Sequence, residues 1–384
     1  MMRRCNKILA SLIIVSTILI SAVSCNKEID FGFKDLCFYH PHTAPVKVNV
    51  DWSKFRHIEQ PTGMTVYVWP EDTQEENYTF LTHNLNAITL DLISGSYHAF
   101  VFNQSSSEYG TIEFHNLHDY KKAEARVRQV KSNWYSTKLP DTKVGSEPEW
   151  LAVDCVEGIE VTDEMVAIAE EEYLAGLPEA NRHHKQDQKA TRDNANSVHH
   201  IGTLVPKSII KNLDIHIHIE NIVFLRSTLA AIENMAEGCY ISSLKTTEGV
   251  VTHTLESWSL IYDDFDESGA VNYKNGSITA SLSTFGLPAG HSGKPEDNMI
   301  FIKLLLVDNQ TIVEYRFPVG DLLAQMNEYD GTQIDEDGNV IWPKLHVYLP
   351  EPLPEVEPVG GSGGAFDVGV GEWGDEIVTE LPLL

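Results

Sequence analysis

Two histidines near the middle of the chain have a spacing at which they could hold a metal ion. Apolar and polar residues alternate over 212–220, and this alternation predicts a strand that buries one of its faces. His216 and His218 then lie on the opposite face, next to Asp214 and Glu220. Two imidazoles at this spacing can bind a divalent transition metal when a third ligand approaches. The alternation by itself accounts for the spacing, so we favour a solvated strand face over a metal site.

Two other motifs have the form of catalytic-serine motifs. Ser362 lies among glycines that fit G-x-S-x-G, but no strand is predicted before it and no helix after it, so the turn that presents such a nucleophile lacks its framework. Ser242 and Lys245 fit S-x-x-K, a pattern that arises often by chance, and its companion motifs are missing from the sequence. Phosphate-binding loops and dinucleotide fingerprints are missing as well. We therefore expect a protein that is not an enzyme and needs no cofactor.

An acidic segment over 335–339 is similar to the start of a calcium-binding loop. An EF-hand loop needs Gly at its sixth position and Glu at its twelfth, and here these positions hold Val340 and His346. Asp337 followed by Gly338 is instead typical of a tight turn between two strands. We therefore interpret the segment as a hairpin turn.

Covalent chemistry is expected at a cysteine near the N-terminus. Residues 1–24 have the pattern of a secretory signal peptide, in which basic residues come first, an apolar run covers 8–20, and small residues precede Cys25. The run is short for the alternative, an uncleaved membrane-spanning anchor. Residues 22–25 resemble a bacterial lipobox, at which Cys25 is diacylated and becomes the new N-terminus. Each acyl methylene that enters a bilayer contributes about 0.8 kcal/mol, so such chains hold a folded domain on a membrane.

The residues after the expected lipid site contain a second targeting signal. Lys27, Glu28 and Asp30 resemble the Lys-then-acidic export signal that sends lipoproteins of the Bacteroidetes to the outer face of the outer membrane. We therefore expect a chain that is lipid-anchored in the cell outer membrane and exposed at the surface.

Composition excludes one class of partner and leaves the state of the thiols open. The chain has 384 residues with 56 acidic and 28 basic side chains, so its formal net charge is −28. Nucleic-acid binding draws its affinity from clustered Lys and Arg, and no such cluster occurs. Cys37, Cys155 and Cys239 lie beyond the expected lipid site. They permit one disulfide at most, and buried free thiols are an equally open alternative.

Short alternating segments dominate the rest of the chain. The first block predicts strands at 46–52, 64–69, 87–92, 97–103, 110–115, 150–155 and 158–161, with a hairpin turn at 93–96 and a helix over 163–176. The second block predicts a strand at 212–220, one amphipathic helix over 223–238, and strands at 253–262, 276–285, 299–307, 311–317 and 345–349. Strands at such short spacing indicate antiparallel sandwiches. The expected fold class is all-β with a few short helices, in two tandem antiparallel β-sandwich domains.

The composition shifts along the chain divide it into six expected parts. These are a lipoprotein signal peptide (1–24), a tether (25–45), an N-terminal β-sandwich domain (46–180), a linker or loop (181–203), a C-terminal β-sandwich domain (204–350) and a Pro/Gly-rich tail (351–384). Residues 365–384 of the tail regain some apolar character, so they could be a donated strand or a loosely docked tail.

Weak patterns over most of the chain resemble one bacterial superfamily. The segment 90–103, with its apolar strand, Gly turn and second apolar strand, resembles an element of the fimbrillin superfamily of Bacteroidetes. Segments 38–42, 46–52 and 64–70 are similar to a fimbrillin-like lipoprotein family of Bacteroides that is related to the anchor subunits of type V fimbriae. The strand that ends at Glu220 and the expected helix after it are similar to the second-domain pattern of that family.

The resemblance implies a fold and a role. It implies two transthyretin-like β-sandwich domains in tandem, anchoring through acylated Cys25, and other fimbrial subunits as partners by strand addition. Polymerising subunits of the superfamily are matured by proteolysis after an Arg, and the chain has no convincing site of that kind. An anchor, tip or accessory subunit of a fimbria is therefore expected.

A glycan-binding lipoprotein of a nutrient-uptake system is the alternative. It predicts a flat exposed row of tryptophans, for which the candidates are Trp52, Trp69, Trp134, Trp258, Trp342 and Trp373. Tryptophans on strands are more often core residues.

Overall fold

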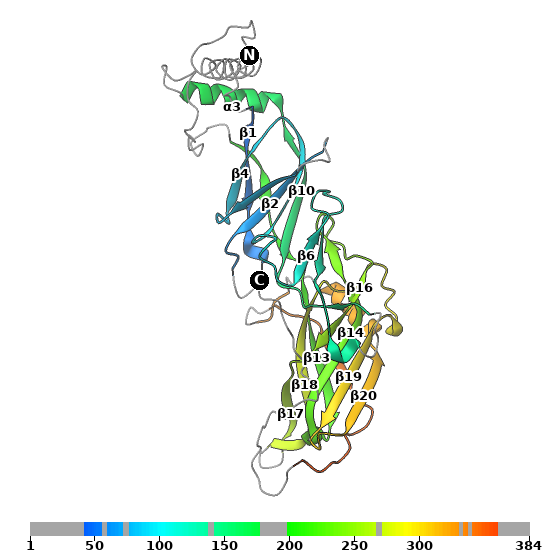
Figure 1. The fold of residues 1–384 in the computed structure, drawn as a ribbon. Coiled ribbons are helices and arrows are strands. Elements are labelled where there is room, and N and C mark those ends of the chain that lie inside the picture. The colour runs from blue at the N-terminus through cyan, green and yellow to red at the C-terminus, as the bar shows by residue number, and fades with distance from the viewer. Residues whose placement is uncertain are drawn as a thin grey trace, which may run out of the picture.

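Strands are the main secondary structure in the described part of the chain. The computed structural model describes residues 42–55, 60–71, 77–136, 142–176, 198–265, 271–329, 333–336 and 340–359. In this part of the chain the strands form five sheets, and they are arranged in an elongated molecule with α3 (Asp163–Gly176) near one end (Figure 1). The remaining helices are short: α2 (Asn133–Ser136), α4 (Gly320–Leu323), and the 3₁₀ turns η1 (Trp52–Lys54), η4 (Ile222–Phe224), η5 (Pro295–Asp297) and η6 (Ala324–Glu328). None of the described helices is long and apolar enough to span a bilayer.

Two sheets face each other in the N-terminal half. Sheet A contains β11 (His199–Leu204), β1 (Ala44–Val50) and β4 (Ala87–Leu92), in that order. Sheet B contains, in order, β12 (Lys207–Ser208), β10 (Ala152–Val161), β5 (Gly95–Asn103), β2 (Met64–Pro70) and β3 (Tyr78–Thr82). Apolar side chains of both sheets form one buried cluster, which includes Val46, Leu90 and Val66.

The central strands of sheet B are buried on both of their faces. Val66 and Val101 belong to the cluster shared with sheet A, whereas Tyr67 and Phe100 belong to an aromatic cluster on the opposite face. Sheet C covers that second face, and it contains β15 (Gly238–Tyr240), β7 (Glu124–Val127) and β6 (Ile112–His115) in that order. Because both faces of β2 are covered, its residues read as a nearly continuous apolar run.

Two further sheets form the C-terminal half. Sheet D contains, in order, β20 (Ile312–Pro318), β19 (Met299–Leu306), β14 (Leu225–Ala236), β16 (Val250–Leu255), β9 (Val144–Gly145) and β8 (Gln129–Val130). Sheet E contains, in order, β17 (Ser259–Phe265), β18 (Val271–Thr284), β13 (Lys211–Glu220) and β21 (Lys344–Tyr348). Ile215 and Ile217 of sheet E and Ile300 and Ile302 of sheet D lie in one buried cluster.

Strand pairing joins the two halves of the chain. β9 from the N-terminal half pairs in parallel with β16, and β7 pairs with β15. Conversely, two strands from the second half of the chain pair with strands from the first half: β11 pairs with β1, and β12 pairs with β10. The expected domain boundary at residue 204 thus falls inside β11, and strands from each half complete sheets of the other.

The predicted all-β class is confirmed, but the helix predicted over 223–238 is wrong, because most of that segment is the strand β14. β14 lies between β19 and β16 and is covered on both faces. Ala230 and Ile232 point into the main cluster of the C-terminal half, while Ala231 packs with Tyr135 and Val144 on the other side. Apolar residues on both faces removed the alternation of period two and left spacings that fit a helix.

The predicted hairpin at 93–96 is also wrong. β4 pairs with β1 in sheet A and β5 pairs with β2 and β10 in sheet B, so the connection crosses between sheets. Two other segments contain a different number of strands from the number predicted. The strands expected at 150–155 and 158–161 are the single strand β10, with a bulge at Gly158, whose φ is +69°. The strand expected over 253–262 is two strands, β16 and β17, in different sheets.

Candidate functional site: the open edge of strand β6

Several of the residues singled out in the sequence for chemistry lie outside the described part of the chain. Cys25, Lys27, Glu28 and Asp30 are among them, and so is Ser362. Asp337 and Gly338 also lie outside it, but Ile334 and Val340 on either side form an antiparallel bridge, as a hairpin turn requires.

The two histidines of β13 lie on the outer face of sheet E, as predicted for a solvated strand face. His218 Nε2 lies 3.0 Å from Nδ1 of His346 on β21, and the ring of His216 stacks on His346 at 4.9 Å. Tyr348 stacks on His218 at 4.3 Å. The rings therefore lie side by side across the strands instead of converging on a point. No group of three metal-binding side chains is found among the described residues.

The tryptophans do not form a platform in the part of the chain that the structure describes. Trp69 is buried in the aromatic cluster, and Trp258 packs against the main cluster of the C-terminal half. Trp52 donates its Nε1–H to Leu85 O, and Trp134 stacks with Phe301. Trp150 and Trp342 stack on each other, with their ring centres 5.9 Å apart. Each of these rings packs against the protein and is at least half-buried.

Strand β6 presents an open edge. Among the described residues it pairs only with β7, so its other side has no partner strand. Arg128 N–H donates to Thr111 O (2.8 Å), so Thr111 and Arg128 are a hydrogen-bonded pair. In an antiparallel ladder every second residue pair is hydrogen-bonded, which sets the direction of the peptide groups along β6. The peptide groups of Glu113 and His115 therefore face β7, and those of Ile112 and Phe114 face outward. These outward groups can accept a further strand.

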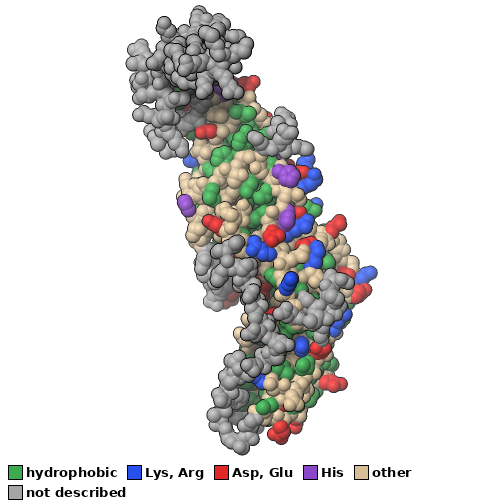
Figure 2. Space-filling model, in the orientation of Figure 1, with side chains coloured by type: hydrophobic (Ala, Val, Ile, Leu, Met, Phe, Trp, Pro, Cys, Tyr) green, Lys and Arg blue, Asp and Glu red, His purple; other side chains and the backbone are tan. Residues whose placement is uncertain are grey.

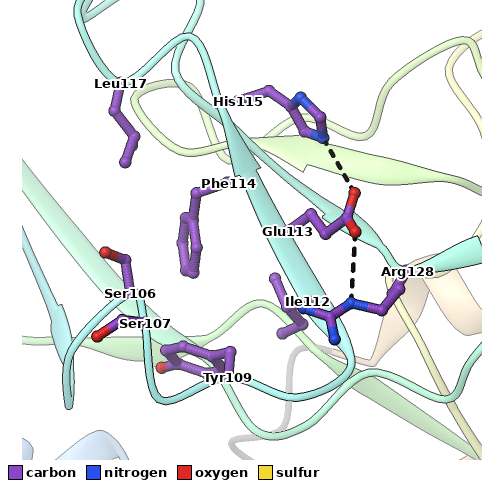
Figure 3. A pocket seen from close by; sticks show the side chains of 9 residues that line it. All are labelled: Ser106, Ser107, Tyr109, Ile112, Glu113, Phe114, His115, Leu117 and Arg128. Atoms are coloured by element: carbon purple, nitrogen blue, oxygen red, sulfur yellow. Dashed lines mark ion pairs between the residues drawn. The ribbon is translucent and has the colours of Figure 1, made fainter. Parts of the chain in front are cut away.

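A groove of about 420 Å³ runs beside this edge (Figure 3). Tyr109, Phe114 and Leu117 supply its apolar surface, and Ser106 and Ser107 line its far side. The Phe114 ring stacks on Phe102 at 5.1 Å and meets Tyr109 at 5.3 Å. The Tyr109 hydroxyl donates to Asn103 O at 2.7 Å, and burial raises the pKa of this phenol well above its ordinary value. The apolar wall is therefore held in place by packing and by a hydrogen bond.

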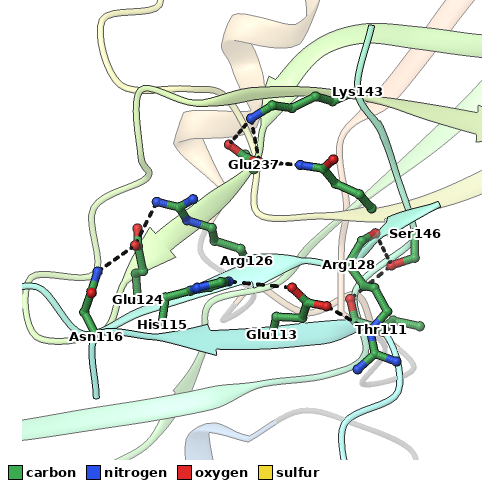
Figure 4. Close-up of polar contacts among 11 residues, drawn as sticks. Thr111, Glu113, His115, Asn116, Glu124, Arg126, Arg128, Lys143, Ser146 and Glu237 are labelled. Carbon is green, nitrogen blue, oxygen red and sulfur yellow. Dashed lines mark hydrogen bonds and ion pairs between the residues drawn. The ribbon is translucent and has the colours of Figure 1, made fainter. Parts of the chain in front are cut away.

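Polar contacts define where the open edge begins. Glu149 Oε2 accepts hydrogen bonds from the backbone N–H groups of Gly110 (2.8 Å) and Thr111 (3.0 Å). On the face of β6 away from the cluster, the Glu113 carboxylate lies 3.3 Å from Arg128 Nε and 3.7 Å from His115 Nε2 (Figure 4). The charges next to the edge are thus paired with one another, and the outward peptide groups start at Ile112.

Two nearly buried carboxylates support the sheet behind the edge. Glu124 accepts hydrogen bonds from Asn116 (3.1 Å) and Arg126 (2.8 Å), and Glu237 accepts one from Lys143 (3.0 Å). Each carboxylate has a positive partner, which burial of a charge requires. In Figure 2, charged side chains gather around the middle of the molecule on the face that is drawn. The contacts of Glu124 lie within or next to sheet C, and the Lys143–Glu237 pair joins the residue before β9 of sheet D to the residue before β15 of sheet C.

The two described cysteines, Cys155 and Cys239, are free thiols. Cys155 and Cys239 form no disulfide with each other, and the Cys155 thiol lies 3.3 Å from Ser242 O. Burial raises the pKa of Cys155 to about 11 and that of Cys239 to about 12. Neither thiol has the lowered pKa of a reactive nucleophile.

Among the described residues, the site therefore combines an unpaired strand edge with an apolar groove. The sequence pattern predicted a strand at 110–115, but its position at an edge was not predicted. The serine-rich turn before Tyr109 and the short length of the strand were the available signals, because edge strands are often short.

Comparison with solved structures finds distant similarity over most of the chain. The chain is similar to a candidate adhesin from Bacteroides ovatus, with 11% identity, coverage of 82% of this chain and 94% of the other, and a TM-score of 0.47. The fimbrial anchor protein Mfa2 from Porphyromonas gingivalis has 10% identity, coverage of 74% and 85%, and a TM-score of 0.40. The tip fimbrial protein Mfa3 from the same organism has 10% identity, coverage of 80% and 96%, and a TM-score of 0.28.

The resemblance to adhesins and fimbrial proteins of Bacteroidetes that the sequence predicted is thus found. None of the proteins with curated descriptions matches the chain. Residues 25–256, which are more than half of the chain, match the profile of a family described as a domain of unknown function, DUF5119. The chain therefore belongs to the DUF5119 family.

Proposed function

We propose that the protein is a surface lipoprotein that serves as an anchor, tip or accessory subunit of a fimbria and binds a partner subunit by strand addition at β6. The observation that supports this proposal is the unpaired edge of β6 beside an apolar groove. An added strand would form hydrogen bonds with the outward peptide groups of Ile112 and Phe114, and its alternate side chains would enter the groove.

The composition of β6 favours pairing. Proteins usually protect open edges with Lys, Pro, or charges that point inward, because an unprotected edge pairs with other chains. The four residues of β6 include neither Lys nor Pro, and the Glu113 carboxylate is already paired with Arg128. An approaching strand would therefore meet no unpaired charge from β6.

Anchoring through Cys25 completes the proposal. The match to the family profile begins at Cys25, where the mature chain is proposed to start. Acyl chains at this position would hold the protein in the outer membrane, and Lys27, Glu28 and Asp30 would direct it to the outer face. The proposal also includes the fold implied by the resemblance. Two transthyretin-like sandwiches in tandem would be formed by sheets A and B and by sheets D and E. Residues 365–384 are a candidate donor strand for a neighbouring subunit.

A pair of substitutions at one position tests the edge. Phe114→Pro removes an outward N–H without removing a bond to β7, because Pro is tolerated at the open side of an edge strand. Phe114→Leu keeps the N–H and removes only the aromatic ring, so it is the matched control. Both variants are expressed in the native bacterium, chemically cross-linked at the cell surface and captured, and the captured proteins are identified.

We expect the wild-type chain and Phe114→Leu to capture fimbrial subunits and Phe114→Pro to lose them. Thermal unfolding of both variants checks that each remains folded. Equal capture by the two variants would exclude β6 as the acceptor. Capture of a glycan-uptake system in place of fimbrial subunits would overturn the adhesive role itself.

A further inference from the structure

A second cavity lies at the junction of the two halves, away from the β6 groove. Its volume is about 500 Å³, within the range of small-molecule sites. Ile210 and Phe285 contribute to its apolar floor, together with Leu287 and Cys239. All four residues are at most 4% exposed, so the floor belongs to the packed interior.

Three lysines line the same cavity. They are Lys207 of β12, Lys211 of β13 and Lys245 from the turn after β15, and no Asp or Glu among the described residues lines the cavity with them. Lys211 Nζ donates to Met326 O at 3.0 Å. Lys207 and Lys245 form no ion pair or side-chain hydrogen bond with any described residue. All charged residues of the described lining are thus basic, although the chain has a net charge of −28, and this favours a negatively charged occupant.

The turn that carries Lys245 is strained. Leu244 has a φ of +55°, a conformation that bulky residues rarely adopt, and its side chain is 42% exposed beside the cavity. Leu244 N–H donates to Tyr240 O, and Tyr240 N–H donates to Lys245 O, so the turn is held by its own backbone. Strain of this kind persists only where the surrounding structure fixes the backbone, and it often occurs at ligand-binding sites.

We propose that this cavity binds a small organic anion in which a carboxylate is joined to an apolar body. The apolar body would lie on Ile210 and Phe285, and the carboxylate would pair with Lys207 and Lys245. Burial of the apolar body supplies affinity roughly in proportion to the area removed from water. An inorganic anion would leave the apolar floor uncovered, and a neutral apolar molecule would leave the positive charge of the lysines uncompensated. This inference does not depend on the proposed role in fimbriae.

Calorimetric titration with octanoate tests the proposal. The protein used is the chain from residue 26 onward, which retains every residue of the described fold and requires no detergent. We expect one octanoate site per chain. Acetate, which lacks the apolar body, should not bind measurably, and 1-octanol, which lacks the charge, should bind at least tenfold more weakly.

Substitution of the lysines locates the site. The double variant Lys207→Gln and Lys245→Gln should bind octanoate at least tenfold more weakly than the parent chain. Lys303→Gln, on β19 of sheet D and outside the cavity lining, is the matched control and should bind as the parent chain does. The proposal is overturned if octanoate does not bind at millimolar concentration, or if the double variant, shown to be folded by circular dichroism, binds with unchanged affinity.

Discussion

The hydroxyl of Tyr135 donates a hydrogen bond of 2.7 Å to Glu233 Oε1, although the two residues are 98 positions apart in the chain. Tyr135 lies on α2 in the N-terminal half, and Glu233 lies on β14 of sheet D. Arg316 donates to the other carboxylate oxygen at 2.6 Å. Burial of the phenol and its bond to the carboxylate raise the pKa of Tyr135. This contact therefore ties the two halves together through a nearly buried, fully paired carboxylate.

Removal of the Tyr135 hydroxyl should destabilise the protein. Tyr135→Phe leaves one oxygen of a nearly buried carboxylate without its donor, and such a loss costs about 1–3 kcal/mol. Urea unfolding of the variant measures the free energy directly. Tyr273→Phe is the control, because Tyr273 is 57% exposed and its hydroxyl can bond to water. A free energy of unfolding equal to that of the parent chain would show that the contact adds nothing.

A methyl group at Gly238 should disturb the strand pairing between the halves. A Cβ at this position would lie 2.4 Å from Ala125 O and 2.9 Å from Arg126 Cγ, both on the paired strand β7. Since a backbone carbonyl cannot move aside without breaking the ladder, we expect Gly238→Ala to lower the free energy of unfolding by about 1–3 kcal/mol. At Gly110 the nearest atom to such a Cβ is 3.4 Å away, so Gly110→Ala is the control. Similar melting temperatures for the two variants would contradict this prediction.

The sequence predicted strands well where one face alone is buried. In β13 the buried residues alternate with half-buried ones, as predicted for 212–220. In β14 the pattern failed, because Ala231 is buried on one face and Ile232 on the other. Local periodicity records how many faces of a strand are covered, and it cannot reveal which distant strand covers them.

The candidate site depends on such long-range pairing. Alternation identified β6 as a strand, but its open edge follows from the order β15-β7-β6 in sheet C. β15 comes from the C-terminal half, and its pairing with β7 turns β6 into the outer strand. The hairpin predicted between β4 and β5 failed for the same reason, because each strand pairs with a distant neighbour. Residue types alone do not specify these neighbours.

Both described thiols should resist alkylation in the folded protein. The thiolate is the reactive form, and burial raises the pKa to about 11 at Cys155 and about 12 at Cys239. At pH 8 iodoacetamide should therefore label these two cysteines far more slowly in the folded chain than in guanidinium. Mass spectrometry of the labelled peptides separates them from Cys37. Labelling of Cys239 at the same rate in both conditions would show that the thiol is accessible.

His253 should make the protein acid-sensitive. The side chain is completely buried in β16, and this burial lowers its pKa from 6.5 to about 4. Between these two values the unfolded chain binds a proton that the folded chain does not. The free energy of unfolding therefore decreases as the pH falls from 6.5 to 4, by about 3 kcal/mol from this residue. Below pH 4 both states are protonated, and the residue causes no further loss.

Comparison with an apolar variant isolates the contribution of His253. His253→Leu cannot take up a proton, so its free energy of unfolding should fall less steeply between pH 6.5 and 4 than that of the parent chain. Carboxylates titrate in the same range, but they contribute equally to both proteins and cancel in the difference. Parallel curves for the two proteins would mean that His253 does not become harder to protonate on folding.

Substitution of Cys25 should release the protein from the membrane. If Cys25 is acylated, labelled palmitate should enter the wild-type chain and should be absent from Cys25→Ala. Multiple acyl chains bind a bilayer stably, whereas a folded domain with a net charge of −28 has no electrostatic attraction to anionic lipid. Cys37→Ala is the matched control and should keep both the label and the attachment. Attachment of Cys25→Ala to envelope fractions as firm as that of the wild type would show that another element holds the protein there.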